Sequence, residues 1–127
     1  MMKRDLDWIK PHYAVKSNPI DGIMEIMMKH GLGFDCASKM EIEKALSMGA
    51  DPNDIVYSNS IKNEPDIVYA DKVGVKYTTA DSMDEIIKLA QYNRNMKVLW
   101  RISIKEKNSE ELKTIFSNKF GDDLDVN

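Results

Sequence analysis

The sequence predicts an α/β fold made of five strand–helix units. Short stretches with the composition of strands recur at steps of 21 or 22 residues and are centred near Tyr13, Phe34, Val56, Tyr77 and Val98. The segments between them carry apolar residues at the i, i+3, i+4, i+7 spacing of a helix. Strands that alternate with helices are typical of a parallel sheet with right-handed crossovers. With 43% apolar and 31% charged residues, the chain has the composition of a globular domain.

The helical spacing is clearest in the first and fourth helical segments, and each of these helices is expected to bury one face against the sheet. The residues predicted for the buried faces are Ile20, Ile23, Met24 and Met27 in the first segment, and Met83, Ile86, Ile87 and Ala90 in the fourth.

The helix ends have signals of their own. Capping boxes are predicted where Ser38 begins "SKME" and Ser82 begins "SMDE", and Pro65 suits the first turn of the third helix. Helix C-termini are expected just before the glycines. These glycines are Gly31, Gly49 and Gly74.

Five such units fit two architectures. A five-stranded doubly wound sheet is complete at 127 residues if "SEELKTIF", residues 109–116, supplies the last helix. A partial (β/α)8 barrel of the TIM type would contain about five of its eight units, since a whole barrel takes about 250 residues. The repeat alone leaves both open, and economy favours the first.

Composition excludes several classes of partner. The net charge is −3 and the lysines alternate with acids, so no basic stripe for nucleic acid is present. The apolar stretches are far shorter than the roughly 20 residues that span a membrane, and the opening residues lack a signal-peptide core. We expect a cytoplasmic protein. The single cysteine, Cys36, allows no intrachain disulfide or thiolate metal cluster and is expected to be a buried apolar residue.

Three charged residues lie on strands that should be buried. Lys16 is predicted to end the first strand, Asp35 to lie in the second and Arg101 in the fifth, each near the carboxyl end, where both architectures bind ligands. Alternation along a strand places these three on one face. It pairs them there with Ala14, Gly33 and Leu99, and puts Tyr13, Val15, Phe34, Trp100 and Ile102 on the other face. A barrel explains this, because the charged residues then converge at the top of its interior.

Structural roles are the alternative for each of these residues. Lys16 could reach into solvent, Asp35 could stabilise a turn and Arg101 could form an ion pair. A lysine enclosed by apolar walls instead has a lowered pKa, and its neutral amine can form a Schiff base with an aldehyde. That reaction is the chemistry of pyridoxal 5'-phosphate.

These residues lie in motifs that resemble a known family. The stretches "PHYAVKSNP", "GLGFDCASKMEIE", "IVYSNSIKN", "VKYTTADSMDEI", "VLWRIS" and "FSNKFG" are similar to the amino-terminal part of eukaryotic-type ornithine decarboxylases, over residues 11–121. "YAVK" is shared with diaminopimelate decarboxylases, whereas "FDCASKME" is closer to the ornithine enzymes. Because this group has an alanine-racemase-like barrel, the resemblance implies a partial (β/α)8 barrel.

The resemblance also implies roles for individual residues. Lys16 would bind the cofactor covalently, Asp35 would be an active-site acid beside it, and Arg101 would support the ring or phosphate of the cofactor. Glu41 matches a further acid of the family, although its place in "SKME" equally suits a helix cap. Lys119 resembles a lysine that pairs across the dimer interface of the family.

The implied activity is decarboxylation of L-ornithine to putrescine in polyamine biosynthesis, by a homodimer that acts on a small amino acid. The resemblance implies that residues 1–127 are a fragment of the pyridoxal-phosphate-binding barrel, without the carboxyl-terminal β domain and inactive alone. Ser17 stands where many relatives have cysteine, and "YSNSIKN" stands where "YANPCKQ" is more usual. Neither difference is expected to affect the chemistry.

Other functions remain open at the level of sequence. One is a non-catalytic binding protein of the antizyme-inhibitor kind, although retention of Lys16, Asp35 and Arg101 argues against it. Another is a decarboxylase for a different basic amino acid, such as diaminopimelate or arginine. A free-standing domain of response-regulator architecture is a third, but it needs acidic residues where this chain has Lys16 and Ser58 or Asn59.

Overall fold

The computed structural model describes residues 8–103 and 122–123, and its main feature is a five-stranded parallel sheet. The strands follow one another in the order β1-β2-β3-β4-β5. A doubly wound sheet reverses direction at a switch point, so the sequential order rejects that alternative and confirms the barrel-type prediction. The strands are β1 (His12–Ala14), β2 (Gly33–Cys36), β3 (Ile55–Tyr57), β4 (Tyr77–Ala80) and β5 (Lys97–Trp100).

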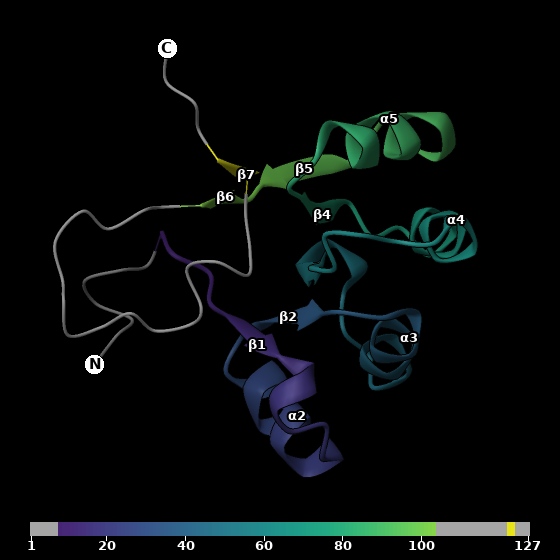
Figure 1. Cartoon of the computed structure of the whole chain (residues 1–127). Coiled ribbons are helices and arrows are strands. Elements are labelled where there is room, and N and C mark those ends of the chain that lie inside the picture. The colour runs from purple at the N-terminus through teal and green to yellow at the C-terminus, as the bar shows by residue number, and fades with distance from the viewer. Residues whose placement is uncertain (1–7, 104–121, 124–127) are drawn as a thin grey trace, which may run out of the picture.

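Four helices connect the strands and all lie on the same, outer side of the curling sheet (Figure 1). This one-sided arrangement is that of a barrel wall, in which every crossover returns along the outside. The helices are α2 (Asp21–Lys29), α3 (Lys39–Ser47), α4 (Glu64–Lys72) and α5 (Met83–Tyr92). Two 3-10 turns, η1 (Val15–Ser17) and η2 (Pro52–Asp54), complete the connections.

The strand register reproduces the repeat seen in the sequence. Tyr13 is the Cα partner of Phe34, and Phe34 is the partner of Ile55, each 21 residues further along the chain. Val56 pairs with Tyr77 in the same way. One strand–helix unit therefore advances the chain by one strand with almost no shift of register.

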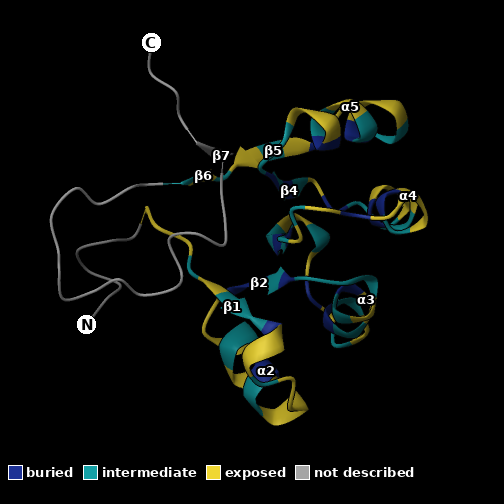
Figure 2. Cartoon of the chain, viewed as in Figure 1, coloured by how far each residue is buried: buried dark blue, intermediate teal, exposed yellow. Residues whose placement is uncertain are grey.

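The apolar core lies between the sheet and the helices (Figure 2). From the strands it takes Phe34, Cys36, Ile55 and Tyr57, all nearly inaccessible to solvent, and from the helices Met24, Ile42, Ile67 and Leu89. Val15 is buried as well, as predicted, although it lies in the turn η1 and not in the strand. Trp100 and Ile102 were predicted for the same face but are exposed. In the part of the chain that the structure describes, no helix follows β5 to cover them.

The predicted helix ends are confirmed. The hydroxyls of Ser38 and Ser82 accept hydrogen bonds from the third residue of their helices, at 3.2 and 3.4 Å. Pro65 lies in the first turn of α4, two residues after the N-cap residue Asn63. The glycines that follow α2, α3 and α4 all have positive φ, a conformation that favours glycine. Their φ angles are 77° at Gly31, 95° at Gly49 and 87° at Gly74.

The buried face predicted for α5 is confirmed only for Ile86, which packs against the core. Met83 and Ile87 are 65% and 54% exposed, whereas Glu85 and Leu89 are buried. The buried face of α5 therefore differs from the predicted one, because the carboxylate of Glu85 forms ion pairs with Lys62 and Lys88. In α2 the prediction holds for Met24, but Ile20 precedes the helix as its N-cap residue and is exposed.

Two short strands pair beyond the main sheet. They are β6 (Ile102–Ser103) and β7 (Asp122–Asp123), which run parallel. The helix predicted over residues 109–116, and Lys119, lie outside the described residues. No helix among the described residues is long and apolar enough to cross a membrane.

Candidate functional site

Lys16 lies just beyond the first strand. β1 ends at Ala14, and Lys16 is the middle residue of the turn η1, which corrects the prediction that it ends the strand. The chain turns there because Ser17 Oγ donates a hydrogen bond to the carbonyl oxygen of Ala14 at 2.7 Å. Alternation along a strand therefore does not apply to Lys16. The apolar walls predicted around it are not supplied by residues 8–103, because its side chain is exposed.

Asp35 lies within β2, as predicted. Its Cα partners are Ala14 on β1 and Val56 on β3, so it faces the inner side of the sheet, away from the buried Phe34 and Cys36. The side chain is half-buried, and its Oδ1 accepts a hydrogen bond from the hydroxyl of Ser58.

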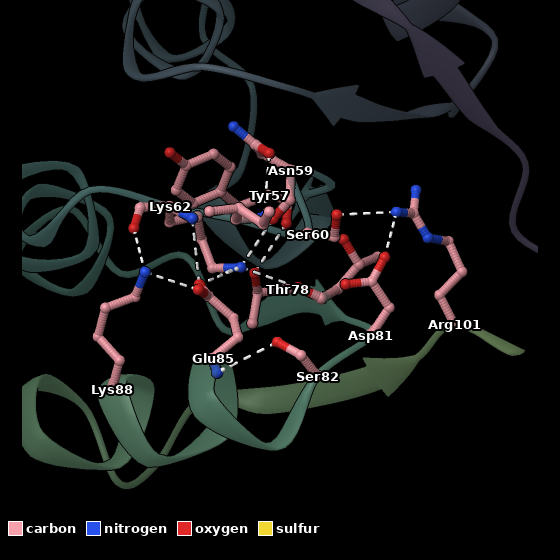
Figure 3. A network of polar contacts seen from close by, with 12 residues as sticks. Tyr57, Asn59, Ser60, Lys62, Thr78, Asp81, Ser82, Glu85, Lys88 and Arg101 are labelled. Carbon is pink, nitrogen blue, oxygen red and sulfur yellow. Dashed lines mark hydrogen bonds and ion pairs between the residues drawn. The ribbon is translucent and has the colours of Figure 1, made fainter. Parts of the chain in front are cut away.

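Arg101 is the first residue after β5, one position beyond the strand in which it was predicted. Its backbone N–H still donates to the carbonyl of Ala80 at 2.8 Å, which continues the ladder with β4. Its Nη2 donates to Ser60 Oγ at 2.8 Å and forms an ion pair with Asp81 (Figure 3). The structural ion pair considered for Arg101 is thus present.

Glu41 occupies the third position of α3. Its Oε2 accepts a hydrogen bond from the backbone N–H of Ala37 at 2.6 Å, while its own N–H is bonded to Ser38 Oγ. The carboxylate therefore serves the helix cap. Together with burial, which is the main cause, the charges of Glu41 and Asp35 raise the pKa of the Cys36 thiol to about 12.

All four predicted site residues lie at the carboxyl edge of the sheet, but they form separate contacts. Asp35 contacts Ser58, Arg101 contacts Ser60 and Asp81, and Glu41 contacts its own helix end. Within residues 8–103, Lys16 has no hydrogen-bond or ion-pair partner for its side chain. Its amine is free for a covalent partner.

Sequence reasoning missed a buried ionic cluster beneath this edge. Lys62 Nζ donates to the carbonyl oxygens of Asn59 and Thr79, at 2.7 and 2.8 Å, and lies 3.0 Å from Glu85 Oε1. Lys88 Nζ lies 2.6 Å from the other oxygen of the same carboxylate. Figure 3 shows these side chains converging between the segment after β3 and the first turns of α5.

The environment shifts the pKa of both buried groups. Burial lowers the pKa of the Lys62 amine, and the hydrogen bond and charge of Glu85 oppose this effect. Burial would raise the pKa of the Glu85 carboxyl, but the hydrogen bonds from Lys88 and Lys62 outweigh it, so the pKa is lowered. The Lys62 amine also lies 5.6 Å from the ring centroid of Tyr57. Burial and the ionic contacts thus act in opposite directions on each of the two groups.

The arrangement fits an aldehyde cofactor held by a lysine. Such a group needs an amine, and Lys16, which forms no ion pair within the described residues, provides one at the edge of the sheet where parallel α/β folds bind ligands. Asp35 faces the inner side of the sheet from the neighbouring strand. Arg101 keeps its guanidinium at the same edge, with part of its charge balanced by Asp81.

Comparisons with known proteins agree with this geometry. Residues 1–127 match the family model described as pyridoxal-dependent decarboxylase, pyridoxal binding domain. The chain is 45% identical over 100 residues to a chloroplastic ornithine decarboxylase of Nicotiana glutinosa, covering 79% of this chain and 23% of the relative. It is 38% identical over 113 residues to antizyme inhibitor 2 of Xenopus laevis, covering 89% of this chain and 24% of that protein.

A solved structure shares the fold. The arginine decarboxylase of Paramecium bursaria Chlorella virus superposes with a TM-score of 0.83 at 33% identity. The match covers 98% of this chain and 33% of that one. The chain thus spans between about a quarter and a third of the length of each of these three proteins.

Proposed function

Since the chain belongs to the pyridoxal-dependent decarboxylases, we propose that it is part of an enzyme that converts L-ornithine to putrescine. The cofactor of this family is pyridoxal 5'-phosphate. The observation that carries the proposal is the amine of Lys16, which has no partner in the described part of the chain and lies at the carboxyl edge of the sheet, beside the strand that presents Asp35. The similarity to an ornithine decarboxylase supports the choice of substrate.

The chain's own residues would have distinct tasks. Lys16 would hold the cofactor through Nζ, which forms no ion pair within the described residues. Asp35 would balance the charge of Lys16 when the amine is protonated, and Ser58 keeps its carboxylate in one orientation. Arg101 would add positive charge at the far end of the edge. When bound, the cofactor supplies an electron sink that lets the α-carboxylate leave as carbon dioxide.

The proposal concerns a larger protein. We infer that residues 1–127 form the first part of a barrel domain and supply the side of the site that carries the amine. Groups that hold the phosphate and the pyridine nitrogen would come from other parts of a homodimeric enzyme, with Lys119 at its interface. By this proposal, residues 1–127 alone release no carbon dioxide from ornithine.

Two further functions have some support. The similarity to antizyme inhibitor 2 favours a binding protein without catalysis, and the likeness to a viral arginine decarboxylase favours another basic substrate. The position of Lys16 next to the strand that carries Asp35 argues for the enzyme, because a protein that does not bind the cofactor needs neither residue at this edge.

A hybrid protein tests the proposal. Residues 1–127 would replace the matching segment of the Nicotiana glutinosa ornithine decarboxylase, and Lys16→Ala would be compared with Lys29→Ala, an exposed lysine on α2. We expect Lys16→Ala to abolish cofactor absorbance, borohydride labelling and release of carbon dioxide from ornithine, whereas Lys29→Ala keeps all three.

The same assay separates the alternatives. Release from arginine or diaminopimelate in preference to ornithine would correct the substrate. A folded hybrid that binds no cofactor would favour the non-catalytic function. Unchanged turnover in Lys16→Ala would show that this lysine does not hold the cofactor.

A further inference from the structure

The segment between β3 and α4 contacts two of the predicted site residues at once. Ser58 Oγ donates to Asp35 Oδ1, and Ser60 Oγ accepts from Arg101 Nη2 at 2.8 Å. Asp35 lies on the strand before β3, whereas Arg101 follows β5. Two serines separated by one residue thus reach charged groups that come from opposite sides of the segment.

Both ends of this segment are held in place. At its start, the backbone N–H of Ser58 donates to the carbonyl of Cys36 on β2, at 2.8 Å. At its end, the fully buried amine of Lys62 bonds back to Asn59 and across to Thr79 on β4, and pairs with Glu85. Figure 3 shows Lys62 and Ser60 on the same short stretch, with Arg101 beyond it. A segment tied to β2, β4 and α5 is a rigid support for its two hydroxyls.

We propose that Ser58 and Ser60 are positioning residues for the decarboxylase site, with the Lys62–Glu85 ion pair as the anchor of their segment. This inference rests on the proposed function. Ser58 holds the carboxylate of Asp35 in one rotamer. Ser60, together with Asp81, holds the guanidinium of Arg101. The sequence carried no sign of this, because the contacts join residues 23 and 41 positions apart.

A purely structural role for Ser58 predicts different behaviour. A hydroxyl that only satisfies a half-buried carboxylate would alter stability, and its loss would leave the kinetics of a folded enzyme unchanged. A positioning hydroxyl acts through Asp35, so its removal matters only while Asp35 is present. A double-mutant cycle separates the two roles.

The kinetic experiment uses the hybrid enzyme and the variants Ser58→Ala, Ser58→Thr and Asp35→Ala. We expect Ser58→Ala to lower kcat/KM about three- to tenfold, as the loss of one hydrogen bond to a charged group does. Ser58→Thr keeps the hydroxyl and should restore most of the activity. In the Asp35→Ala background, which has no acceptor for the Ser58 hydroxyl, Ser58→Ala should have no further effect. Ser47→Ala, which removes an exposed serine hydroxyl on α3, is the matched control.

A second measurement needs no activity. Urea unfolding of the 127-residue chain should show coupling between Ser58→Ala and Asp35→Ala. The unfolding constant of the double variant should differ several-fold from the value expected if the two effects were independent. If the hybrid is inactive but the coupling is present, the proposed function fails and the contact stands.

The remaining outcomes overturn the inference. An equal loss of kcat/KM from Ser58→Ala in both backgrounds would show that the hydroxyl does not act through Asp35. Additive unfolding would show that the contact is not made in solution. Ser60→Ala is tested in the same way against Arg101→Gln, with cofactor affinity as the readout. If Ser60→Ala weakened cofactor binding equally with Arg101 and with Gln at position 101, Ser60 would not act through Arg101.

Discussion

Replacing Glu85 by leucine should destabilise the folded chain by about 3–5 kcal/mol, the cost of breaking a buried ion pair by removing one partner. The side chain of Lys62 is 0% exposed and that of Glu85 is 3% exposed. Without Glu85, the Lys62 ammonium keeps two carbonyl acceptors but loses its countercharge. The effect should be largest at neutral pH, where the amine is protonated in the unfolded chain.

Replacing Lys62, the other partner of the ion pair, should destabilise the chain less than replacing Glu85. In Lys62→Met the carboxylate of Glu85 keeps Lys88, at 2.6 Å, and the backbone N–H of Lys62, at 3.2 Å. We expect a loss of about 1–3 kcal/mol, mainly from the two carbonyls left without a donor. The double variant Lys62→Met/Glu85→Leu should lie within about 2 kcal/mol of the native chain, because buried pairs can be replaced by apolar side chains. Lys88→Met is the control: its amine side chain is 26% exposed, so we expect at most about 1 kcal/mol.

The pH dependence gives an independent check. Burial lowers the pKa of Lys62, so the folded chain binds fewer protons at this site than the unfolded chain. Stability then rises with pH until the amine of the unfolded chain loses its proton, near pH 10.4. In Glu85→Leu this pKa should fall further, so the penalty should shrink between pH 7 and pH 10. Urea unfolding followed by far-UV circular dichroism measures both effects. The reasoning would be refuted if the losses of unfolding free energy in Glu85→Leu and Lys62→Met added up to the loss in the double variant. It would also be refuted if the loss in Glu85→Leu did not change with pH.

Two further predictions concern β2, the strand that carries Asp35. Gly33→Ala should destabilise the chain by about 1–3 kcal/mol, because the added Cβ would lie 2.5 Å from the carbonyl oxygen of Asp54 and 2.5 Å from His12 Cδ2. Gly22→Ala, in α2 with open space around it, should instead stabilise by up to about 1 kcal/mol in the same unfolding assay, and an equal effect at both sites would contradict the clash. Cys36, with its pKa raised to about 12, should react with thiol reagents at pH 8 about a thousandfold more slowly in the folded than in the urea-unfolded chain; comparable rates would show that the thiol is accessible.

The regular repeat explains why the fold could be predicted. Each strand–helix unit is local, and the register moves from Tyr13 to Phe34 to Ile55 in equal steps. Once the order of strands is sequential, the choice of barrel follows. The repeat itself does not contain that order, because sequential and doubly wound sheets share the same alternation of elements. The choice came from the motifs around Lys16 and Asp35.

The site was predicted less well, for reasons that particular residues make clear. Lys16 was placed on a strand because a three-residue turn closed by one serine hydroxyl looks like a strand end in the sequence. Helical periodicity placed only apolar residues on the buried face of α5 and left Glu85 out of it. Its burial depends on Lys62, 23 residues earlier, and no local pattern reports a contact of that length. The contact of Ser58 with Asp35 is hidden for the same reason.

The connections after the strands carry most of the site, and this arrangement separates its chemistry from the stability of the fold. Lys16, Ser58, Ser60 and Arg101 all lie outside the five strands, so changes there leave the core between sheet and helices intact. Lys62 is the exception, because its buried ion pair serves both the packing of α5 and the placement of the two serines. A change at Lys62 therefore alters stability and site geometry together. The effect of geometry alone must be measured at Ser58 and Ser60, where the hydroxyls can be removed without opening the core.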